Sequence, residues 1–295
     1  MAFNWQTFKT RTITSIVFAA VMLTGLLWNQ WSFFILFSVI HFGCWWEYLK
    51  LTENIFNKRI SKFSKILLAD LGYVLFWLIG FKDHETLGLK IVSTITIARA
   101  LIFLLIAGII AFLLFNKKVS LKEKLMCLGG FVYISLSLGL MMNLSDPHRN
   151  PNVLYFVDPI YLVEIPLLII LSIWVNDTMA YIVGSLIGKT SISKVSPKKT
   201  WEGTIGGIFM CLMVVSLFSY FTELSNDETI DYLMIALISC VVGTFGDLLE
   251  SKLKRMANVK DSGHIMPGHG GFLDRFDSML LAIPAVWLFV YFFMR

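Results

Sequence analysis

Residues 246–278, with the sequence GDLLESKLKRMANVKDSGHIMPGHGGFLDRFDS, are polar in a chain that is otherwise mostly apolar. They hold five cations, two histidines and five carboxylates, which are Asp247, Glu250, Asp261, Asp274 and Asp277. Carboxylate oxygens are ligands that Mg²⁺ prefers, and lysine and arginine bind phosphate oxygens. The stretch therefore predicts a site for a divalent cation and a phosphate, with a solvated, charge-balanced loop as the alternative.

The composition around this stretch is that of a membrane protein. Of the 295 residues, 57% are hydrophobic and only 15% are charged, which is unusual for a soluble domain. Apolar runs of roughly bilayer-crossing length occur nine times, at residues 13–28, 31–46, 66–81, 91–115, 125–142, 160–183, 203–221, 230–246 and 279–294. We predict an all-α, polytopic integral membrane bundle of about nine transmembrane helices. The first run lacks a clean cleavage site and is expected to be a retained helix rather than a signal peptide.

The distribution of basic residues predicts the orientation of the chain. With nine spans and a cytoplasmic N-terminus, 20 of the 25 Lys and Arg residues fall on the cytoplasmic side, as short cytoplasmic loops require. The loops at 47–65 and 116–124 are then basic surfaces that face lipid headgroups. The net charge of +5 reflects this topology and gives no reason to expect nucleic-acid binding.

Isolated polar residues within the predicted spans have two readings. An ionisable side chain inside a membrane is a functional candidate by default, which applies to His41, Asp70 and Asp177. Asp70 could equally face water, and Asp177 could bond to a neighbouring helix instead of facing a polar cavity. The four cysteines are scattered singly and are expected to be packing residues.

The segment after the sixth predicted span adds a second phosphate-binding candidate. Small residues at Ala180, Gly184 and Gly188 allow a helix or a substrate to approach closely. Ser196 suits a helix N-cap and Pro197 a first helical position. Free N–H groups at that helix start, with Lys198 and Lys199 beside them, would attract phosphate. A basic anchor for anionic lipid is the alternative.

Carboxylate spacing then connects the two ends of residues 246–278. Asp247 and Glu250 are three residues apart, as are Asp274 and Asp277, so each pair shares a helix face where its segment is helical. Asp247 ends the eighth predicted span and Asp274 begins the ninth, with a long loop between them. Two acidic ends brought together require a cation. Such a site indicates phosphoryl or nucleotidyl transfer, and no P-loop is present for a Walker-type ATPase.

These residues also resemble a known family. The runs SKLKR at 251–255, KD at 260–261, PGHGG at 267–271 and DRFD at 274–277 closely resemble the signature of the phosphatidate cytidylyltransferases, or CDP-diacylglycerol synthases. Upstream, ND at 176–177, AY at 180–181 and SPKKTWEG at 196–203 look like that family's second block. The resemblance covers about residues 170–280, whereas the first 150 residues match only in being hydrophobic. Met266 departs from the Leu, Ile or Phe expected there.

The resemblance implies transfer of a cytidylyl group from CTP to phosphatidic acid, which gives CDP-diacylglycerol and pyrophosphate. It implies Mg²⁺ in a two-metal site whose second ion could be monovalent. The implied metal ligands are Asp247 and Asp274 first, then Asp277 and Asp261, with Lys260 also at the catalytic centre. The implied substrate contacts are Asp177, Ser196, Lys198, Lys199, Lys254, Arg255, His269, Gly270, Gly271 and Arg275.

The resemblance also implies an organisation and a place in the cell. Residues 1–150 would form an N-terminal membrane region of about five spans, and residues 151–295 a catalytic region whose site faces the cytoplasm. The chain would lie in a bacterial-type plasma membrane, as a possible homodimer. Two rival functions remain open: a CTP-dependent polyprenol or phytol kinase, and a cation transporter. The transporter predicts ionisable residues spread through several spans, whereas here they gather at one face.

Overall fold

The computed structural model describes residues 5–80, 120–145, 164–263 and 270–294, with side chains from residue 12 onwards. Within these residues the chain is helical and forms no strand, although Ser191 and Thr200 pair in an isolated bridge and Gly270 is a further bridge residue. The elements are α1 (Trp5–Leu27), α2 (Gln30–Phe56), α3 (Lys62–Gly80), α5 (Leu121–Gly130), the π-helix η1 (Phe131–Leu136), α6 (Ser137–Leu144), α8 (Glu164–Ile187), α9 (Trp201–Phe221), α10 (Asn226–Met256) and α11 (Leu273–Phe292). The prediction of an all-α chain is confirmed.

Seven helices in the described part of the chain are long and apolar enough to cross a membrane. They are α2, α3, the continuous α5–η1–α6 helix (Leu121–Leu144), α8, α9, α10 and α11. Each overlaps one predicted apolar run, and α1 adds a shorter apolar helix at Thr12–Leu27. The predicted run at 91–115 lies outside the described residues. The chain is an integral membrane protein, and the count of nine stays a prediction.

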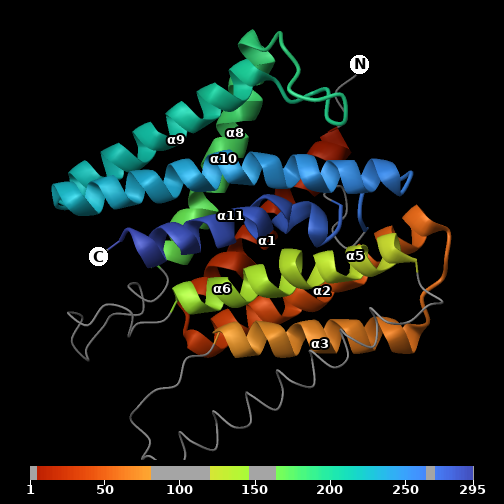
Figure 1. The fold of residues 1–295 in the computed structure, drawn as a ribbon. Coiled ribbons are helices and arrows are strands. Elements are labelled where there is room, and N and C mark those ends of the chain that lie inside the picture. Colours follow the sequence, from red (N-terminus) through yellow and green to blue (C-terminus); the bar gives the residue numbers. More distant parts are fainter. Residues whose placement is uncertain (1–4, 81–119, 146–163, 264–269, 295) are drawn as a thin grey trace, which may run out of the picture.

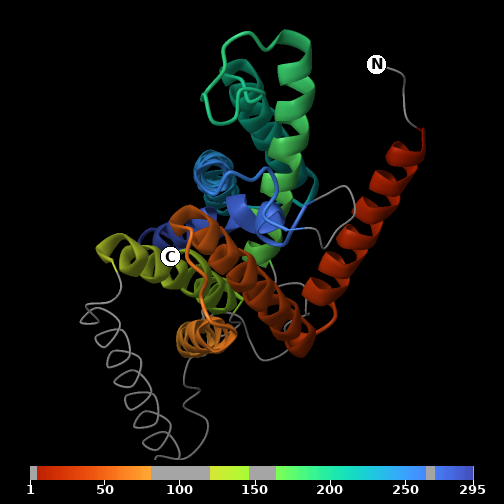
Figure 2. The same cartoon turned by 90° about the vertical axis from the view of Figure 1, so that its right-hand side faces the viewer.

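Helix α11 lies at the centre of the bundle, where it contacts α2, α6, α8 and α10. Figures 1 and 2 show α10 alongside α11, with α2, α3 and α6 on one side of the pair and α8 with α9 on the other. One large apolar core joins these helices through fully buried side chains such as Trp45, Phe76 and Ile283. A smaller core around Cys211, Val215 and Cys240 joins α9 to α10.

Glycines set the closest helix contacts. A Cβ at Gly207 of α9 would lie 2.7 Å from the carbonyl oxygen of Asn176 and 2.9 Å from the Ala180 Cβ, both on α8. A Cβ at Gly246 of α10 would meet the carbonyl oxygen of Asp277 on α11. The close approach predicted from the small residues of α8 is therefore confirmed for its contact with α9. The Gly246 contact brings Asp277 beside the carboxylates of α10.

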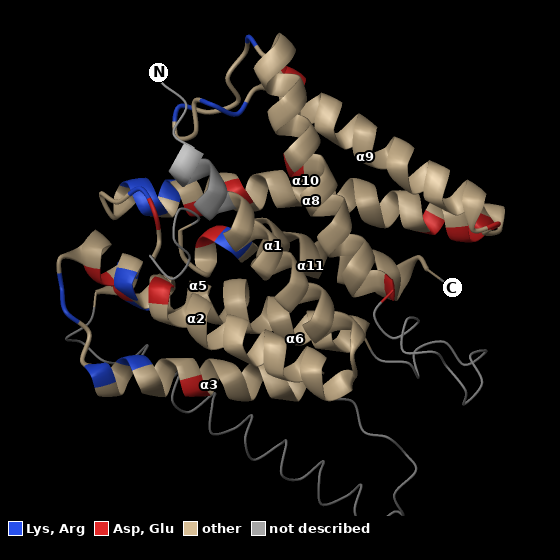
Figure 3. Cartoon of the chain, turned by 180° about the vertical axis from the view of Figure 1, so that it is seen from behind, with Lys and Arg blue, Asp and Glu red and all other residues tan. Residues whose placement is uncertain are grey.

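Basic residues gather at one end of the bundle. Figure 3 shows Lys and Arg where α10 ends and α5 begins, and in the loop that precedes α9, while acidic residues lie at the opposite end of α10. The first turn of α10 holds Asp227 and Glu228, and its last turn holds Lys254 and Arg255. The charge asymmetry expected from the sequence is thus present in the fold, although no membrane side is fixed by it.

The predicted N-cap at Ser196 is wrong. Helix α9 begins at Trp201, and its N-cap is Thr200, whose Oγ1 accepts a hydrogen bond from the Gly203 N–H at 3.2 Å. The Ser196 carbonyl instead accepts the Lys199 N–H at 3.1 Å in a turn. Two further backbone bonds, from Ile192 N–H to the Lys199 carbonyl and from Trp201 N–H to the Thr190 carbonyl, hold residues 190–201 as a hairpin-like loop. The two lysines therefore lie at this turn and not in a first helical turn.

Two predicted loops are partly helical. Helix α10 continues through Met256, so Asp247 lies inside a helix and the connection to α11 is much shorter than expected. Helix α2 continues through Phe56, and Glu47, expected on a basic surface, is only 2% exposed. The cause is packing, because the buried face of α2 continues past residue 47 with Tyr48, Leu49 and Leu51.

The isolated polar residues of the early spans have different places. His41 is fully buried, and its Nε2 lies 2.9 Å from Ser135 Oγ among aromatic rings, which is a core position. Asp70 is exposed on α3. Cys44, Cys211 and Cys240 are buried and Cys127 is half-buried, all without a disulfide. The interpretation of the cysteines as packing residues is confirmed.

The contact between α8 and α9 gives a first prediction. Gly207→Val should lower the free energy of unfolding by about 1–3 kcal/mol, the usual cost of overpacking a tight contact. Phe209→Val is the matched control, because Phe209 lies on the same helix and is 62% exposed. Thermal unfolding of both variants in detergent measures the effect, and equal shifts would contradict the proposed packing role of Gly207.

Candidate functional site

Three carboxylates converge between α10 and α11. Asp247 and Glu250, one turn apart on α10, and Asp277 of α11 place ligand oxygens within 4.8 Å of one another. Glu250 is fully buried, Asp277 is 8% exposed and Asp247 is half-buried. Like charges this close, away from water, are unfavourable unless a cation balances them. The group therefore has the composition and the burial of a divalent-cation site.

Two lysines lie against these carboxylates. Lys199, from the loop before α9, forms an ion pair with Asp247. Lys254, one turn beyond Glu250, places its Nζ 2.5 Å from Glu250 Oε2 and 2.6 Å from Asp274 Oδ1. Among the described residues Glu250 Oε1 has no hydrogen-bond partner, whereas Oε2 is paired with Lys254, so Oε1 retains the capacity to bind a metal. Cations and carboxylates from three separate segments thus meet at one point.

Asp274 has a different role from its neighbour Asp277. Its Oδ2 accepts hydrogen bonds from Ser262 N (2.9 Å) and Gly271 N (2.8 Å) and lies 2.9 Å from Ser262 Oγ. Gly270 has a φ of 84°, a conformation that glycine adopts without strain, and a Cβ there would collide with the Asp274 side chain. Asp274 therefore organises the turn before α11, and the structure does not place it with the three clustered carboxylates.

Glu47 of α2 holds the same turn from the other side, and the sequence analysis missed it. Its carboxylate accepts hydrogen bonds from Ser262 Oγ (2.6 Å), Phe272 N (3.0 Å) and Leu273 N (2.9 Å). Phe272 precedes α11 and has no side-chain cap of its own, so Glu47 supplies the acceptor that the helix start requires. Gly263 and Gly271 lie directly against this carboxylate.

Asp177 of α8 lies on the edge of the site. Its side chain is exposed and interacts electrostatically with Lys199, Asp247 and Arg275. The preceding Asn176 is 2% exposed and its backbone faces the Gly207 contact. Helix α8 thus brings a fourth acidic residue within range of the carboxylate group.

Most of the remaining predicted residues are exposed, and their part in the site stays a prediction. Arg255 donates from Nη1 to the Val259 carbonyl at 3.2 Å, so it folds back over the turn after α10. His269 lies outside the described residues, and Ser196 is half-buried. The exposed residues are Lys198, Arg255, Lys260, Asp261 and Arg275.

Comparison with known proteins adds an independent result. The family model described as "Cytidylyltransferase family" matches residues 9–293, which is nearly the whole chain. The chain belongs to this cytidylyltransferase family. It is 30% identical over 279 residues to a phosphatidate cytidylyltransferase of Staphylococcus aureus, covering 94% of this chain and 96% of that protein.

Two further relatives carry the same name. The protein of Staphylococcus saprophyticus is 32% identical over the same shares of the two chains. The protein of Bacillus subtilis is 47% identical over 116 residues, which cover 39% of this chain and 43% of that protein. The resemblance found in the sequence is confirmed at the level of the family.

Within this cytidylyltransferase chain, Glu47 could have been found by one signal. It is an acidic residue directly after Trp45 and Trp46, at the end of an apolar run, in a segment otherwise read as basic. Intramembrane carboxylates are functional candidates by default. Because the predicted span ended at residue 46, Glu47 was assigned to a loop and was not considered as an intramembrane carboxylate.

Substitution of Glu47 should loosen the turn before α11. Glu47→Gln keeps the size of the side chain but replaces one acceptor oxygen by an NH₂ group, which leaves a buried N–H without a partner at a cost of about 1–3 kcal/mol. We expect faster hydrogen exchange at the Phe272 and Leu273 amides, measured by mass spectrometry in detergent.

Glu53→Gln is the matched control for this variant. Glu53 lies on the same helix and also binds one backbone N–H, of Ile60 at 2.7 Å, and one side chain, of Lys65 at 2.5 Å. It has no described contact with the turn before α11, so its loss should leave exchange at residues 272 and 273 unchanged. The same acceleration in both variants would show a general loss of stability instead.

Proposed function

We propose that this chain is a phosphatidate cytidylyltransferase, an enzyme that transfers CMP from CTP to phosphatidic acid and releases pyrophosphate. One observation carries the proposal: a buried group of three carboxylates with Lys199 and Lys254 against it, at the basic end of a membrane helix bundle. Lys199, Lys254 and Asp277 belong to the two blocks that resemble the cytidylyltransferase signature, and Asp247 and Glu250 directly precede the block that begins at residue 251. The names of the relatives support the same activity.

The proposed metal ligands are Asp247, Glu250 and Asp277. This set differs from the one implied by the sequence, because Asp274 already accepts hydrogen bonds from Lys254 Nζ, Ser262 N and Gly271 N and Asp261 is exposed. Mg²⁺ held there would neutralise the carboxylates and the charge that develops on the triphosphate. A second ion, which could be monovalent, remains part of the proposal.

The lysines of the site would act on the nucleotide. In the described structure Lys199 and Lys254 neutralise carboxylates, and they can turn to triphosphate oxygens once those carboxylates have another cation. A lipid phosphate oxygen forms a bond to the α-phosphorus of CTP, and the bond from that phosphorus to the pyrophosphate oxygen breaks. The attacking oxygen is already ionised at neutral pH, so the chain needs to supply position and charge rather than a general base.

The proposal includes the outer parts of the site. Lys198, Arg255, Lys260 and Arg275 would guide the triphosphate and the lipid phosphate, and Asp177 would face the nucleotide from α8. Gly270, Gly271 and His269 would shape the turn beside it, with Ser196 in the loop before α9.

The proposal also includes a topology. It has nine spans, with the N-terminus and the site at the cytoplasmic face of a bacterial-type plasma membrane, where CTP is available. The basic end of the bundle (Figure 3) supports that side. The division into residues 1–150 and 151–295, the possible homodimer and the absence of nucleic-acid binding stay predictions.

Product analysis tests the activity directly. Purified protein with labelled CTP, phosphatidic acid and Mg²⁺ should give CDP-diacylglycerol and pyrophosphate in equal amounts. A polyprenol or phytol kinase would release CDP and phosphorylate an added lipid alcohol instead. Cation flux into liposomes without nucleotide would favour the transporter.

Substitution of the clustered carboxylates tests the metal assignment. Glu250→Gln and Asp277→Asn should each lower turnover roughly 100-fold or more, the scale for losing a group that stabilises transition-state charge, and should raise the Mg²⁺ concentration needed for half-maximal rate. Asp227→Asn, an exposed carboxylate in the first turn of the same α10, should change neither. A Glu250→Gln enzyme with a normal Mg²⁺ requirement would remove Glu250 from the ligand set.

A further inference from the structure

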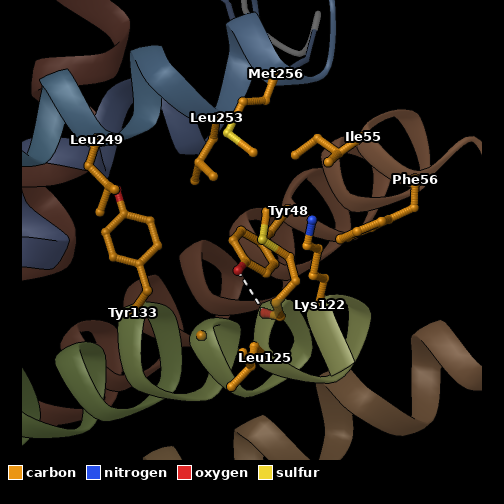
Figure 4. A pocket seen from close by; sticks show the side chains of 11 residues that line it. Tyr48, Ile55, Phe56, Lys122, Leu125, Tyr133, Leu249, Leu253 and Met256 are labelled. Atoms are coloured by element: carbon orange, nitrogen blue, oxygen red, sulfur yellow. Dashed lines mark hydrogen bonds between the residues drawn. The ribbon is translucent and has the colours of Figure 1, made fainter. Parts of the chain in front are cut away.

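An apolar pocket lies beside α10, away from the carboxylate group. Helices α2, α5–η1 and α10 line an open pocket of about 660 Å³, within the range of pockets that bind small molecules. Figure 4 shows Leu249, Leu253 and Met256 of α10 facing Tyr48, Ile55 and Phe56 of α2 and the side chains of α5 across this space. None of the proposed site residues lines it.

The lining of this pocket is apolar along its length. Its two hydroxyl groups already donate hydrogen bonds, from Tyr48 to the Met126 carbonyl at 2.8 Å and from Tyr133 to the Asp277 carbonyl at 3.3 Å. A nucleotide base or a sugar would find few partners there. A hydrocarbon chain would lose no hydrogen bonds on entering, and its burial is favourable.

One charged residue, Lys122, lines the pocket. It lies in the first turn of α5, is exposed, and makes no ion pair within the part of the chain that the structure describes. The adjacent Glu123 pairs instead with Lys58 at 3.0 Å. The charge of Lys122 is therefore available to an anion at the end of an otherwise apolar space.

The position of Lys122 fits the end of a lipid. The pocket runs from the last turns of α2 and α10 and the first turn of α5 towards Tyr133 and Leu249, deeper in the bundle. Helix ends that carry Lys and Arg are where headgroups of anionic lipids lie. A lipid with its phosphate at Lys122 would direct an acyl chain into the pocket.

We propose that this pocket is a non-catalytic binding site for an anionic phospholipid, which inserts one acyl chain between α2, α5 and α10 and places its phosphate at Lys122. None of Asp247, Glu250 and Asp277 lines the pocket, so the site is separate from the carboxylate group. Glu250 has no exposed surface, so the pocket does not open onto the proposed metal ligands. The inference does not require the proposed function.

The pocket is nevertheless linked to the site. Tyr133 forms part of its wall and donates its hydroxyl to the backbone of Asp277. Tyr133 also belongs to the π-helix η1, an irregularity that often occurs at functional positions. An acyl chain in the pocket would fix α10 against α5 and thereby hold the segment that carries Asp277.

Lipid retention measured by native mass spectrometry tests the proposal. The probes are phosphatidylglycerol and phosphatidylcholine with identical palmitoyl and oleoyl chains. Wild-type protein should retain phosphatidylglycerol preferentially, and Lys122→Gln should reduce that preference roughly fivefold, which is what about 1 kcal/mol per lysine near an anionic surface gives. Lys124→Gln is the matched control, because Lys124 lies in the same helix but does not line the pocket.

A variant that fills the pocket gives a second, independent test of whether an acyl chain enters it. Leu125 lines the pocket and is 57% exposed, so Leu125→Trp adds volume with little risk to the core. We expect it to lower retention of both lipids, and a photoactivatable group at the chain end of phosphatidylglycerol to label residues 121–133 in wild type but not in this variant.

Three outcomes would overturn the proposal. Equal loss of preference in Lys122→Gln and Lys124→Gln would show diffuse attraction to the basic surface. Unchanged retention and labelling in Leu125→Trp would show that no chain enters. An increased KM for phosphatidic acid in Leu125→Trp, with phosphatidylglycerol retention unchanged, would assign the pocket to the substrate chain. The binding arms would remain informative if the CTP assay showed no product.

Discussion

A carboxylate inside an apolar helix bundle is stable only when a partner compensates its charge, and this constraint organises the centre of the molecule. The Glu47 carboxylate accepts hydrogen bonds from two backbone N–H groups and from Ser262 Oγ. The Asp274 carboxylate is paired with Lys254 and accepts hydrogen bonds from the backbone N–H groups of Ser262 and Gly271. The Glu47 contacts join segments more than 200 residues apart, and the Lys254–Asp274 contact joins α10 to α11. The acidic residues therefore fix how α2, α10 and α11 meet.

Close backbone contact makes the clustering of the other carboxylates possible. Because Gly246 has no side chain, the backbone of α11 at Asp277 can approach α10, and the Asp277 carboxylate then lies beside Asp247 and Glu250. Gly207 likewise allows α9 to lie directly against α8. This contact positions α9, which begins two residues after Lys199. Close packing at Gly246 thus brings the carboxylates of α10 and α11 together.

Local patterns in the sequence predicted the helices well, because hydrophobic runs and basic loops are properties of single segments. The spacing of Asp247 and Glu250 correctly placed them on one helix face. The different surroundings of Asp274 and Asp277 could not be predicted in this way. They depend on the contacts of Asp274 with Lys254, Ser262 and Gly271, which form only in the folded chain. Glu47 was missed for the same reason, because its partners lie more than 200 residues away in the chain.

Helix α10 separates two environments with opposite chemistry. One face presents Asp247, Glu250 and Lys254 to α11 and the loop before α9, and the other presents Leu249, Leu253 and Met256 to α5 and α2. A rigid helix between a charged site and an apolar pocket allows water-soluble and lipid ligands to be bound close together without mixing their surroundings. Tyr133 bridges the two environments through the Asp277 carbonyl, so a change in packing on the apolar side has a direct physical route to the backbone of a proposed metal ligand.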